Sequence, residues 1–336
     1  MVPGSPGGGI GQMAYILRRI AFYLAAFFVA VTLNFFIPRV MPGDPSARII
    51  ASFQGRLNDA QVEAIRASYG TSGSLWDQYV GYVGQVLRMD FGISTVQFPE
   101  PTSSLLFYGA TWTLVLVGIS IAFAFLIGTM MGIHAAWNRG GFFDSVFTPI
   151  NVMLNAFTPA VVALVLFYAF SLQLQWFPLG RAHSTGLSPS WDPRFIANVL
   201  HHATLPVLSI LIVSFGGWHL GMRNMMINLL NEDFVILARA KGLSDRRVRY
   251  RYVARNAILP QITSLALSIG FLLGGALVTE QVFNYPGLGK FTVTAIESRD
   301  YSFIQAQLLL LTMSVLVANL LSDIANVILD PRLRKG

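Results

Sequence analysis

Long stretches without charged residues follow one another along most of this chain. A helix needs about 20 apolar residues to cross roughly 30 Å of bilayer hydrocarbon, and six of the stretches are long enough. The pattern therefore predicts an all-α polytopic membrane protein with six transmembrane helices. The six stretches are residues 20–38, 101–138, 145–180, 195–222, 256–279 and 301–322.

Three of the stretches exceed the length of one span, so the helix within each has to be placed. Gly216, Gly217 and His219 interrupt the apolar pattern of one of them, the fourth span. The sixth span is expected to continue past Asp323 to Leu329. Within the three longer stretches we expect helices at residues 110–137, 147–174 and 205–222.

With an even number of spans both termini lie on one side, and Lys and Arg next to the spans indicate which side. Positive charge in short loops stays in the cytoplasm, whereas loops as long as residues 39–109 escape the rule. The side of the termini carries fourteen such residues and the other side four. Both termini are therefore predicted to be cytoplasmic. The fourteen are Arg18, Arg19, Arg139, Arg223, Arg239, Lys241, Arg246, Arg247, Arg249, Arg251, Arg255, Arg332, Arg334 and Lys335; the four are Arg181, Arg194, Lys290 and Arg299.

The composition agrees with a membrane protein. Apolar residues make up 54% of the chain and charged residues 12%, about half the charged fraction of soluble domains. The net charge of +7 comes from basic residues beside apolar spans, which topology and anionic lipid explain better than nucleic acid. The absence of cysteine excludes disulfides, thiolate metal sites and cysteine nucleophiles.

The pattern divides the chain into five parts. A Gly- and Pro-rich tail is expected to be disordered, and the first span reads as an uncleaved anchor. The parts are a cytoplasmic tail at residues 1–12, a first transmembrane helix at 13–38, an extracytoplasmic loop at 39–109, a five-helix core at 110–330 with a cytoplasmic loop at 231–257, and a cytoplasmic tail at 331–336.

The extracytoplasmic loop is long enough to fold locally. Asn58 and Gln61 form a capping-box pattern that opens a short helix ending near Tyr69. Apolar and aromatic residues then recur at helical spacing. This stripe either packs on span ends and headgroups, where Trp and Tyr are favoured, or contacts an extracytoplasmic partner. It consists of Trp76, Tyr79, Val80, Val83 and Leu87.

The cytoplasmic loop is the most basic segment of the chain. Asn231 is expected to cap a short helix with Glu232 and Asp233 in its first turn. Gly242 then supplies a left-handed stop. The residues expected on one face of this helix are Phe234, Leu237, Ala238 and Lys241.

A second helix is expected after Gly242. Ser244 is its predicted cap and Asp245 lies in its first turn, with Val248 and Tyr252 on one side. Two helices and a glycine break make a stiff, exposed knob. The structural alternative is a loop held at the lipid headgroups by its arginines.

Short motifs occur in a fixed order along the chain. They resemble the first, B-type, permease subunit of the oligopeptide and dipeptide family of ATP-binding-cassette (ABC) importers, and the resemblance covers residues 13–335. Its central feature is similar to the family's EAA loop, although Leu237 stands at the Glu position and Arg255 at the closing Pro, as is usual in the peptide branch. The motifs are ARAKGLS at 238–244, RYVARNA at 251–257 with Pro260, MPGDP at 41–45, DFGIS at 90–94, EQVFNYPGLG at 280–289, RDY at 299–301 and NLLSD at 319–323, continuing to LDPR at 329–332.

The resemblance implies a type I ABC importer permease fold and a mechanism. In the family, the EAA loop forms a coupling helix that sits in a groove of an ATPase subunit. The implied partners are a second homologous permease, two ATPases that hold ATP and Mg, an extracytoplasmic solute-binding protein and the lipid bilayer of a prokaryotic inner membrane. We call residues 234–244 the coupling segment; the residues expected to act in it are Phe234, Leu237, Ala238, Arg239, Ala240, Lys241, Gly242, Leu243 and Ser244.

The chain is not expected to hydrolyse ATP or to hold a cofactor. The segment GLGKF at 287–291 only partly matches a phosphate-binding loop, because Asn284 and Phe291 occupy the positions of an essential Gly and of Ser or Thr. His134, His201 and His202 lack the spacing of a zinc site and a paired carboxylate.

Polar residues share one face of the last span. They are expected either to form interhelical hydrogen bonds or to contact solute. They are Asn319, Ser322, Asp323 and Asn326.

Three classes of function remain: the permease subunit of an ATP-driven importer, a channel or secondary transporter that needs no ATPase, and an intramembrane enzyme. The last two are disfavoured because few charges lie midway through the spans and no nucleophile or metal cluster is found. The resemblance implies peptide, nickel or oligosaccharide as solute. Short segments at 98–99, 111–114 and 137–144 are similar to the oligosaccharide-importing subset.

Overall fold

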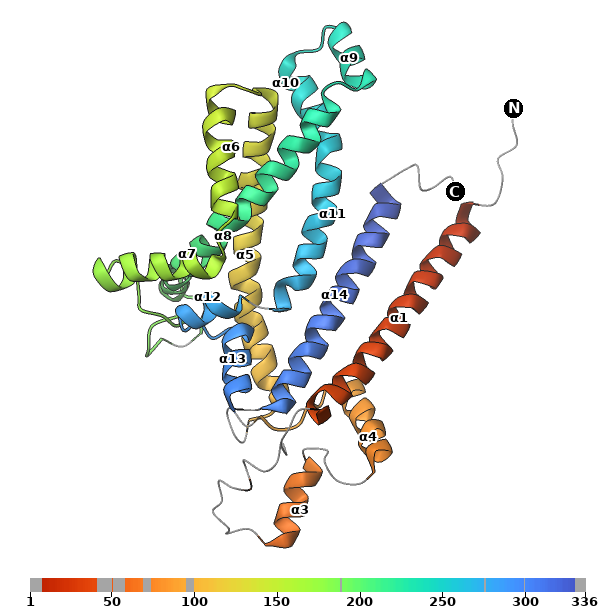
Figure 1. Ribbon diagram of the computed structural model, residues 1–336, viewed down its shortest axis with the longest axis vertical. Helices are drawn as coiled ribbons and strands as arrows, with labels where there is room; N and C mark the ends of the chain where they lie inside the picture. The colour runs from red at the N-terminus through yellow and green to blue at the C-terminus, as the bar shows by residue number, and fades with distance from the viewer. Residues whose placement is uncertain are drawn as a thin grey trace. The chain divides into compact units, whose positions relative to one another are not determined.

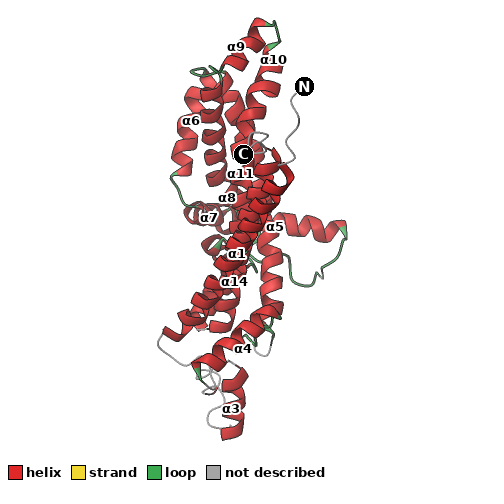
Figure 2. Cartoon of the chain, turned by 90° about the vertical axis from the view of Figure 1, so that its right-hand side faces the viewer, coloured by secondary structure: helices red, strands yellow, loops and turns green. Residues whose placement is uncertain are grey.

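The computed structural model describes the chain as a set of helices (Figure 1). The residues described are 8–40, 50, 58–68, 74–94, 100–187, 189–274, 276–298 and 300–329. Within these ranges there is no strand (Figure 2) and one isolated bridge, Ile93 to Pro101. The predicted all-α class is therefore confirmed. The chain forms two compact units: unit 1 is Met1–Thr111, Leu273–Leu277 and Gly287–Gly336, and unit 2 is Trp112–Leu272 and Val278–Pro286.

Unit 1 is built on two long helices that pack together, α1 (Gly8–Val40) and α14 (Tyr301–Leu329). Polar side chains join them near both ends. The amide Nδ2 of Asn34 donates to the carbonyl oxygen of Gln305 at 2.8 Å, and Nε2 of Gln305 donates to the carbonyl oxygen of Asn34 at 3.1 Å. Towards the other end, Asp323 accepts from the Tyr23 hydroxyl at 2.6 Å and pairs with Arg19 at 3.2 Å.

The start of the chain differs from the prediction. Because α1 begins at Gly8, residues 8–12 of the predicted disordered tail are helical, and each residue added to an existing helix gains one backbone hydrogen bond. Residues 1–7 and 331–336 lie outside the described part of the chain, as do residues 41–45 and Arg299 of the sequence motifs.

Two short helices, α3 (Asp59–Ser68) and α4 (Leu75–Leu87), precede the long helix α5 (Thr102–Trp137). The predicted capping box is confirmed: Gln61 N–H donates to Asn58 Oδ1 at 2.8 Å and Asn58 N–H to Gln61 Oε1 at 3.0 Å. A second capping box, between Ser74 and Asp77, opens α4 and was not predicted.

The predicted apolar stripe of α4 is split between two faces. Tyr79 lies 2.8 Å from the Thr32 hydroxyl of α1, and Val83 packs against a cluster that contains Val86. Trp76, Val80 and Leu87 are exposed. Tyr79 and Val83 therefore pack near the end of α1, as one of the two predicted alternatives has it. For Trp76, Val80 and Leu87, contact with headgroups or with an extracytoplasmic partner stays a prediction.

The rest of unit 1 contains the first ten residues of α5 together with α13 (Leu288–Ser298). α13 packs on α14, and its Phe291 lies in a core with Leu106 and Phe303. Gly109 of α5 makes this packing close, since a Cβ there would lie 2.8 Å from the Phe291 ring.

Unit 2 is built around α8 (Pro193–Leu229), which packs against α6 (Phe142–Asn155), α7 (Pro159–Leu166) and α11 (Arg255–Phe271). α8 is continuous, so Gly216, Gly217 and His219 do not interrupt it. A Cβ at Gly216 would lie 2.7 Å from the Asn151 carbonyl oxygen of α6. This glycine therefore serves close helix packing, as small residues do in membranes.

The predicted third span is broken rather than straight. α6 ends at Asn155, and α7 continues as the π-helix η1 (Phe167–Gln173) at an angle of 97° to α6. Thr158 is extended because a residue before proline disfavours the α conformation, and Pro159 opens α7.

Among the described residues, four helices are long and apolar enough to cross a membrane, and the bent pair makes a fifth if it counts as one span. The four are Leu17–Phe36, Thr102–Trp137, Pro193–Leu229 and Tyr301–Leu321. α11 has 17 residues, which extend about 25 Å at 1.5 Å per residue. It is followed by the 3₁₀ turn η3 (Leu272–Gly274) and by α12 (Leu277–Val282).

Candidate functional site

The coupling segment lies at one end of unit 2, where α9 (Asp233–Ala240) follows α8 after a short turn (Figure 1). The N-cap of α9 is Glu232 rather than the predicted Asn231, and its side chain makes no capping bond. The helix therefore begins one residue later than predicted. Asp233 in the first turn still matches the positive end of the helix.

The predicted left-handed stop is confirmed at Gly242, whose φ is +70°. Gly242 N–H donates to the Arg239 carbonyl at 2.9 Å, and Leu243 N–H donates to the Ala238 carbonyl at 3.3 Å. These two bonds form a Schellman motif, which satisfies the free carbonyls at a helix end. The positive φ favours glycine, although a Cβ here would meet open space.

Ser244 stands at the N-cap of the second helix, as predicted, but its side chain makes no capping bond. This helix is α10 (Asp245–Arg247), which continues as the π-helix η2 (Val248–Ala254) and then as α11. The second half of the loop is thus an uninterrupted extension of the helix that follows it.

One face of α9 is buried against the rest of unit 2. Val235 and Ala238 have exposed fractions of 0% and 2%, and they pack in a cluster with Met222 and Met226 of α8. Ile133 of α5 belongs to the same cluster. The loop is therefore seated on the ends of α5 and α8 by an apolar core, rather than standing away from them as a knob.

The opposite face of α9 is apolar and exposed. Ile236 and Leu237 are 57% and 56% exposed, so Leu237 does not share the buried face of Ala238 that the sequence predicted. The exposed residues around them are Arg239, Ala240, Lys241, Gly242 and Ser244, whereas Phe234 and Leu243 are half-buried. Two large apolar side chains, with Arg239 and Lys241 towards the end of α9 and Asp233 at its start, give α9 a surface that fits an apolar groove with a charged rim.

Arg223, which was counted among the cytoplasmic cations, forms an ion pair. Its Nε and Nη2 donate to the two carboxylate oxygens of Asp144 on α6 at 2.6 and 2.8 Å. Asp144 also accepts from the Thr148 hydroxyl and from Gly140 N–H. The fully bonded pair ties α6 to α8 eleven residues before the coupling segment begins at Phe234.

Further polar residues follow this pair along the same helix junction. The Thr148 hydroxyl lies 3.2 Å from His219 Nε2, and Asn151 contacts α8 at Gly216. Sequence reasoning missed this junction. Its signal was the spacing of Asp144, Thr148 and Asn151, which places three polar side chains on one face of an otherwise apolar helix.

A buried carboxylate was also missed. Glu280 of α12 is fully buried and accepts from the Thr113 hydroxyl of α5 at 2.8 Å. It opens one of the sequence motifs, and the only signal of its burial was its position directly after an apolar span.

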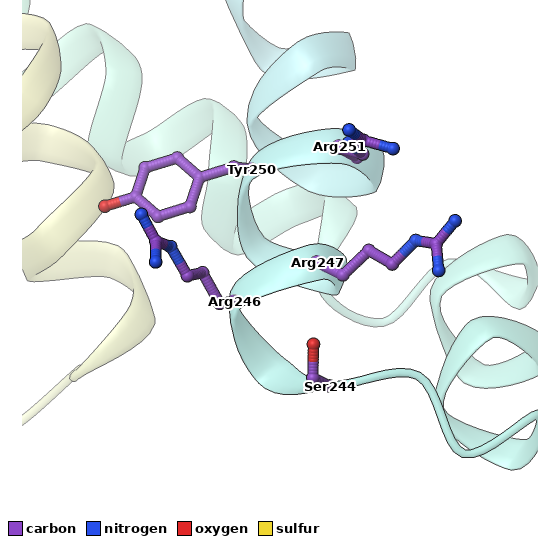
Figure 3. A pocket seen from close by; sticks show the side chains of 5 residues that line it. All are labelled: Ser244, Arg246, Arg247, Tyr250 and Arg251. Atoms are coloured by element: carbon purple, nitrogen blue, oxygen red, sulfur yellow. The ribbon is translucent and has the colours of Figure 1, made fainter.

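Three of the arginines that follow Gly242 line an open pocket together with Ser244 and Tyr250. They are Arg246, Arg247 and Arg251. Figure 3 shows Arg247 and Arg251 on one side of the helix, and Arg246 and Tyr250 on the other. The guanidinium groups therefore do not converge on one bound anion.

The other predicted candidates have local partners. His201 and His202 lie within hydrogen-bond distance of backbone carbonyls, Trp176 and Gly180, and His134 lies next to Asn138. Of the polar face of the last span, Asp323 contacts α1, Asn319 is half-buried, and the side chains of Ser322 and Asn326 lie outside the described residues. In the described ranges no three His, Asp or Glu residues form a metal-binding group.

Comparisons with known proteins place these features in a family. The family described as "Binding-protein-dependent transport system inner membrane component" matches residues 124–335. The oligopeptide transport system permease protein AppB of Bacillus subtilis (strain 168) is 32% identical over 320 residues, which cover 95% of this chain and 99% of AppB. The glutathione transport system permease protein GsiC of Escherichia coli (strain K12) is 33% identical over 324 residues, covering 96% and 99%.

Proposed function

The chain belongs to the family of inner membrane components of binding-protein-dependent transport systems, and from this premise we propose that it is the first permease subunit of an ATP-driven importer of peptides. The coupling segment docks on an ATPase subunit, and closure of the ATPases moves the spanning helices between inward-open and outward-open states. The chain itself supplies part of the solute pathway and the segment on which an ATPase docks, and it holds no cofactor.

The two faces of α9 are the observation that carries this proposal. Val235 and Ala238 fix the helix to α5 and α8, while Ile236 and Leu237 remain exposed beside Lys241. Outside the spans, a pair of exposed apolar side chains is a candidate contact surface for a partner protein. A helix that transmits movement must be fixed to the spans on one face and must offer a contact to the ATPase on the other.

The proposed assembly contains four kinds of partner. A second homologous permease completes the pathway, two ATPases bind ATP and Mg, and an extracytoplasmic binding protein delivers the solute. The description of the matching family, which names binding-protein dependence, supports this assembly.

The proposed location is a prokaryotic inner membrane, with six spans and both termini in the cytoplasm. The candidate spans and the cluster of arginines around the coupling segment support this orientation. The span that brings the count to six is α11, the fifth along the chain, lengthened by η2 at one end and η3 at the other.

The proposed solute is a peptide. AppB is named for oligopeptides and GsiC for glutathione, a tripeptide, and both match along nearly the whole chain. These matches favour peptides over the oligosaccharides and nickel that the sequence motifs left open.

Reconstitution tests the proposal. The chain is tagged, co-expressed with its partner permease and ATPases, purified, and placed in proteoliposomes with the binding protein and labelled glutathione or a labelled oligopeptide. We expect both ATPases to co-purify with the chain and uptake to require ATP. Uptake by proteoliposomes that lack ATPases would instead identify a channel or secondary transporter.

Variants at Gly242 test the role of the coupling segment. A Cβ at Gly242 meets open space in the free chain, although the positive φ strains any residue with a side chain. Gly242→Trp should insert in the membrane but obstruct the ATPase groove and uncouple hydrolysis from uptake. Gly242→Asn is the matched control, since Asn tolerates positive φ and is small. Uptake at the wild-type rate in Gly242→Trp would refute the docking of this segment.

A further inference from the structure

One aromatic side chain contacts both arms of the loop that contains the coupling segment. Trp137 is the last residue of α5. The guanidinium carbon of Arg239 lies 5.5 Å from the centre of its indole ring, and that of Arg249 lies 4.9 Å from it. Arg239 belongs to α9, before the turn at Gly242, and Arg249 belongs to η2, after it.

The Trp137 ring is the contact that the two cations share, and Arg249 also lies 5.8 Å from the centre of the Tyr250 ring. Within the described ranges, neither arginine forms an ion pair. The Nε of Arg249 is buried and has no hydrogen-bond partner there. A cation over an indole ring is stabilised by the negative face of the ring, most strongly where water is excluded, and Trp is the best of the aromatic residues for this contact.

The backbone next to each arginine is held by a buried residue. Ala238 precedes Arg239 and is 2% exposed, and Val248 precedes Arg249 and is fully buried. Both belong to the cluster against which Trp137 packs. The buried residues fix the position of each arm, so each guanidinium reaches the ring with little further loss of side-chain freedom.

α5 is suited to carry a movement away from this point. It is one unbroken helix of 36 residues, about 54 Å long at 1.5 Å per residue. Its first residues, up to Thr111, belong to unit 1 and the remainder to unit 2. A displacement of Trp137 therefore acts on a single element that both units contain.

We propose that Trp137 is a positioning residue for coupling: by holding Arg239 and Arg249 it locks both arms of the loop to α5, so that a movement imposed on the coupling segment is transferred to α5. The transfer rests on the proposed function, whereas the lock itself does not. Without the lock, the loop would bend at Gly242 and absorb part of the movement.

Amide hydrogen exchange on the full chain in lipid nanodiscs tests the lock. The amides to follow are those of Lys241, Gly242 and Leu243, which are bonded at the end of α9. Trp137→Leu keeps apolar volume but removes the ring, and should speed their exchange about 2- to 30-fold, the range that a cation–π contact supports. Trp137→Phe keeps a weaker ring and should fall between Leu and wild type.

A double-variant cycle separates the lock from simple membrane anchoring by tryptophan. Arg239→Gln should speed the same amides, and adding it to Trp137→Leu should cause little further change, because Trp137→Leu has already removed the contact that Arg239→Gln breaks. Arg246→Gln is the matched control, since Arg246 lies in the same loop and the cations over the Trp137 ring are Arg239 and Arg249. Unchanged exchange in Trp137→Leu, or full additivity with Arg239→Gln, would overturn the lock.

The transfer is tested in the assembled transporter by the amount of labelled peptide taken up per ATP hydrolysed. Trp137→Leu should lower this ratio several-fold while the ATPases still co-purify, and Trp137→Phe should restore part of it. If Trp137→Leu speeds amide exchange but leaves the peptide taken up per ATP unchanged, Trp137 holds the loop to α5 but does not transfer movement to it. If no ATPase co-purifies even with the wild-type chain, the proposed function fails, and with it the transfer, while the exchange experiment still decides the lock.

Discussion

An arginine–aspartate pair joins two helices in each unit of this protein, and the two pairs differ in burial. In unit 2, Arg223 of α8 binds Asp144 of α6 through two bonds, and their side chains are 18% and 6% exposed. In unit 1, Arg19 of α1 meets Asp323 of α14 through one contact of 3.2 Å, with side chains 41% and 23% exposed.

The more buried pair, that of Arg223 and Asp144, also has more hydrogen bonds and closer packing around it. Asp144 also accepts bonds from Thr148 and Gly140, and the junction that it occupies holds Gly216 against Asn151. Removing one partner of a buried pair strands a charge, whereas an exposed pair contributes little net stability. The junction of unit 2 is therefore expected to be the more rigid of the two.

The largest expected effect is the loss of Asp144. Asp144→Ala leaves Arg223 buried and unpaired, and should destabilise the protein by about 3–5 kcal/mol. The measurement is thermal or denaturant unfolding of the purified chain in detergent. The double variant Asp144→Leu with Arg223→Met removes both charges and should recover most of the loss; no recovery would mean that the pair is not what holds the junction.

A smaller effect is expected at the glycine of the same junction. A Cβ at Gly216 lies 2.7 Å from the Asn151 carbonyl oxygen, so Gly216→Leu should cost about 1–3 kcal/mol by forcing α6 away from α8. Gly118→Ala is the control, because a Cβ at Gly118 meets nothing within 4 Å. It should be neutral or slightly stabilising, since alanine favours helix. Equal costs at both glycines would contradict close packing at this junction.

In unit 1 the amide contacts between α1 and α14 should weigh less. Asn34→Leu removes the bonds to Gln305 and Tyr82 and should cost about 0.5–1.5 kcal/mol, the net value of a typical hydrogen bond. The same unfolding measurement applies. A cost as large as that of Asp144→Ala would reverse the ranking of the two junctions.

The smallest effect is expected for the exposed pair. Asp323→Asn keeps an acceptor for the Tyr23 hydroxyl and loses only the charge, so the cost should stay below about 1 kcal/mol. It should also shrink in high salt, which screens exposed charges. A cost of several kcal/mol that salt does not change would show that this pair is buried in the membrane-embedded protein.

Much of the helical architecture could be predicted because lipid imposes it. A backbone in hydrocarbon must satisfy its own hydrogen bonds, so charge-free stretches of sufficient length read directly as helices. The break before Pro159 was missed, although the stretch from 145 to 180 is too long for one span and contains the proline. Its length and its Pro159 were the signals for a bend.

At the coupling segment, local features could be predicted and tertiary ones could not. The positive φ of Gly242 follows from its neighbours in sequence, and the structure has it. Which face of α9 is buried depends on Met222 and Ile133, which the pattern of a helix of eight residues cannot reveal. Leu237 was therefore placed on the wrong face.

The ionic contacts of unit 2 were the least accessible to sequence reasoning. Arg223 was counted as one more cytoplasmic cation because charge next to a span is a topological signal. Asp144 lies 79 residues away along the chain, and nothing local links the two. The same holds for Trp137, whose partners Arg239 and Arg249 lie in a different loop.

The contact between Asn34 and Gln305 has a consequence for biosynthesis. The two residues are 271 positions apart, and a ribosome adds roughly 5–20 residues per second. After Asn34 emerges, roughly 15 to 55 s pass before its partner helix exists, and all of unit 2 is made in that interval. During that time the Tyr82 hydroxyl, only 48 positions after Asn34, is the partner that the structure offers this amide, so α1 gains its tie to α14 only after unit 2 has been synthesised.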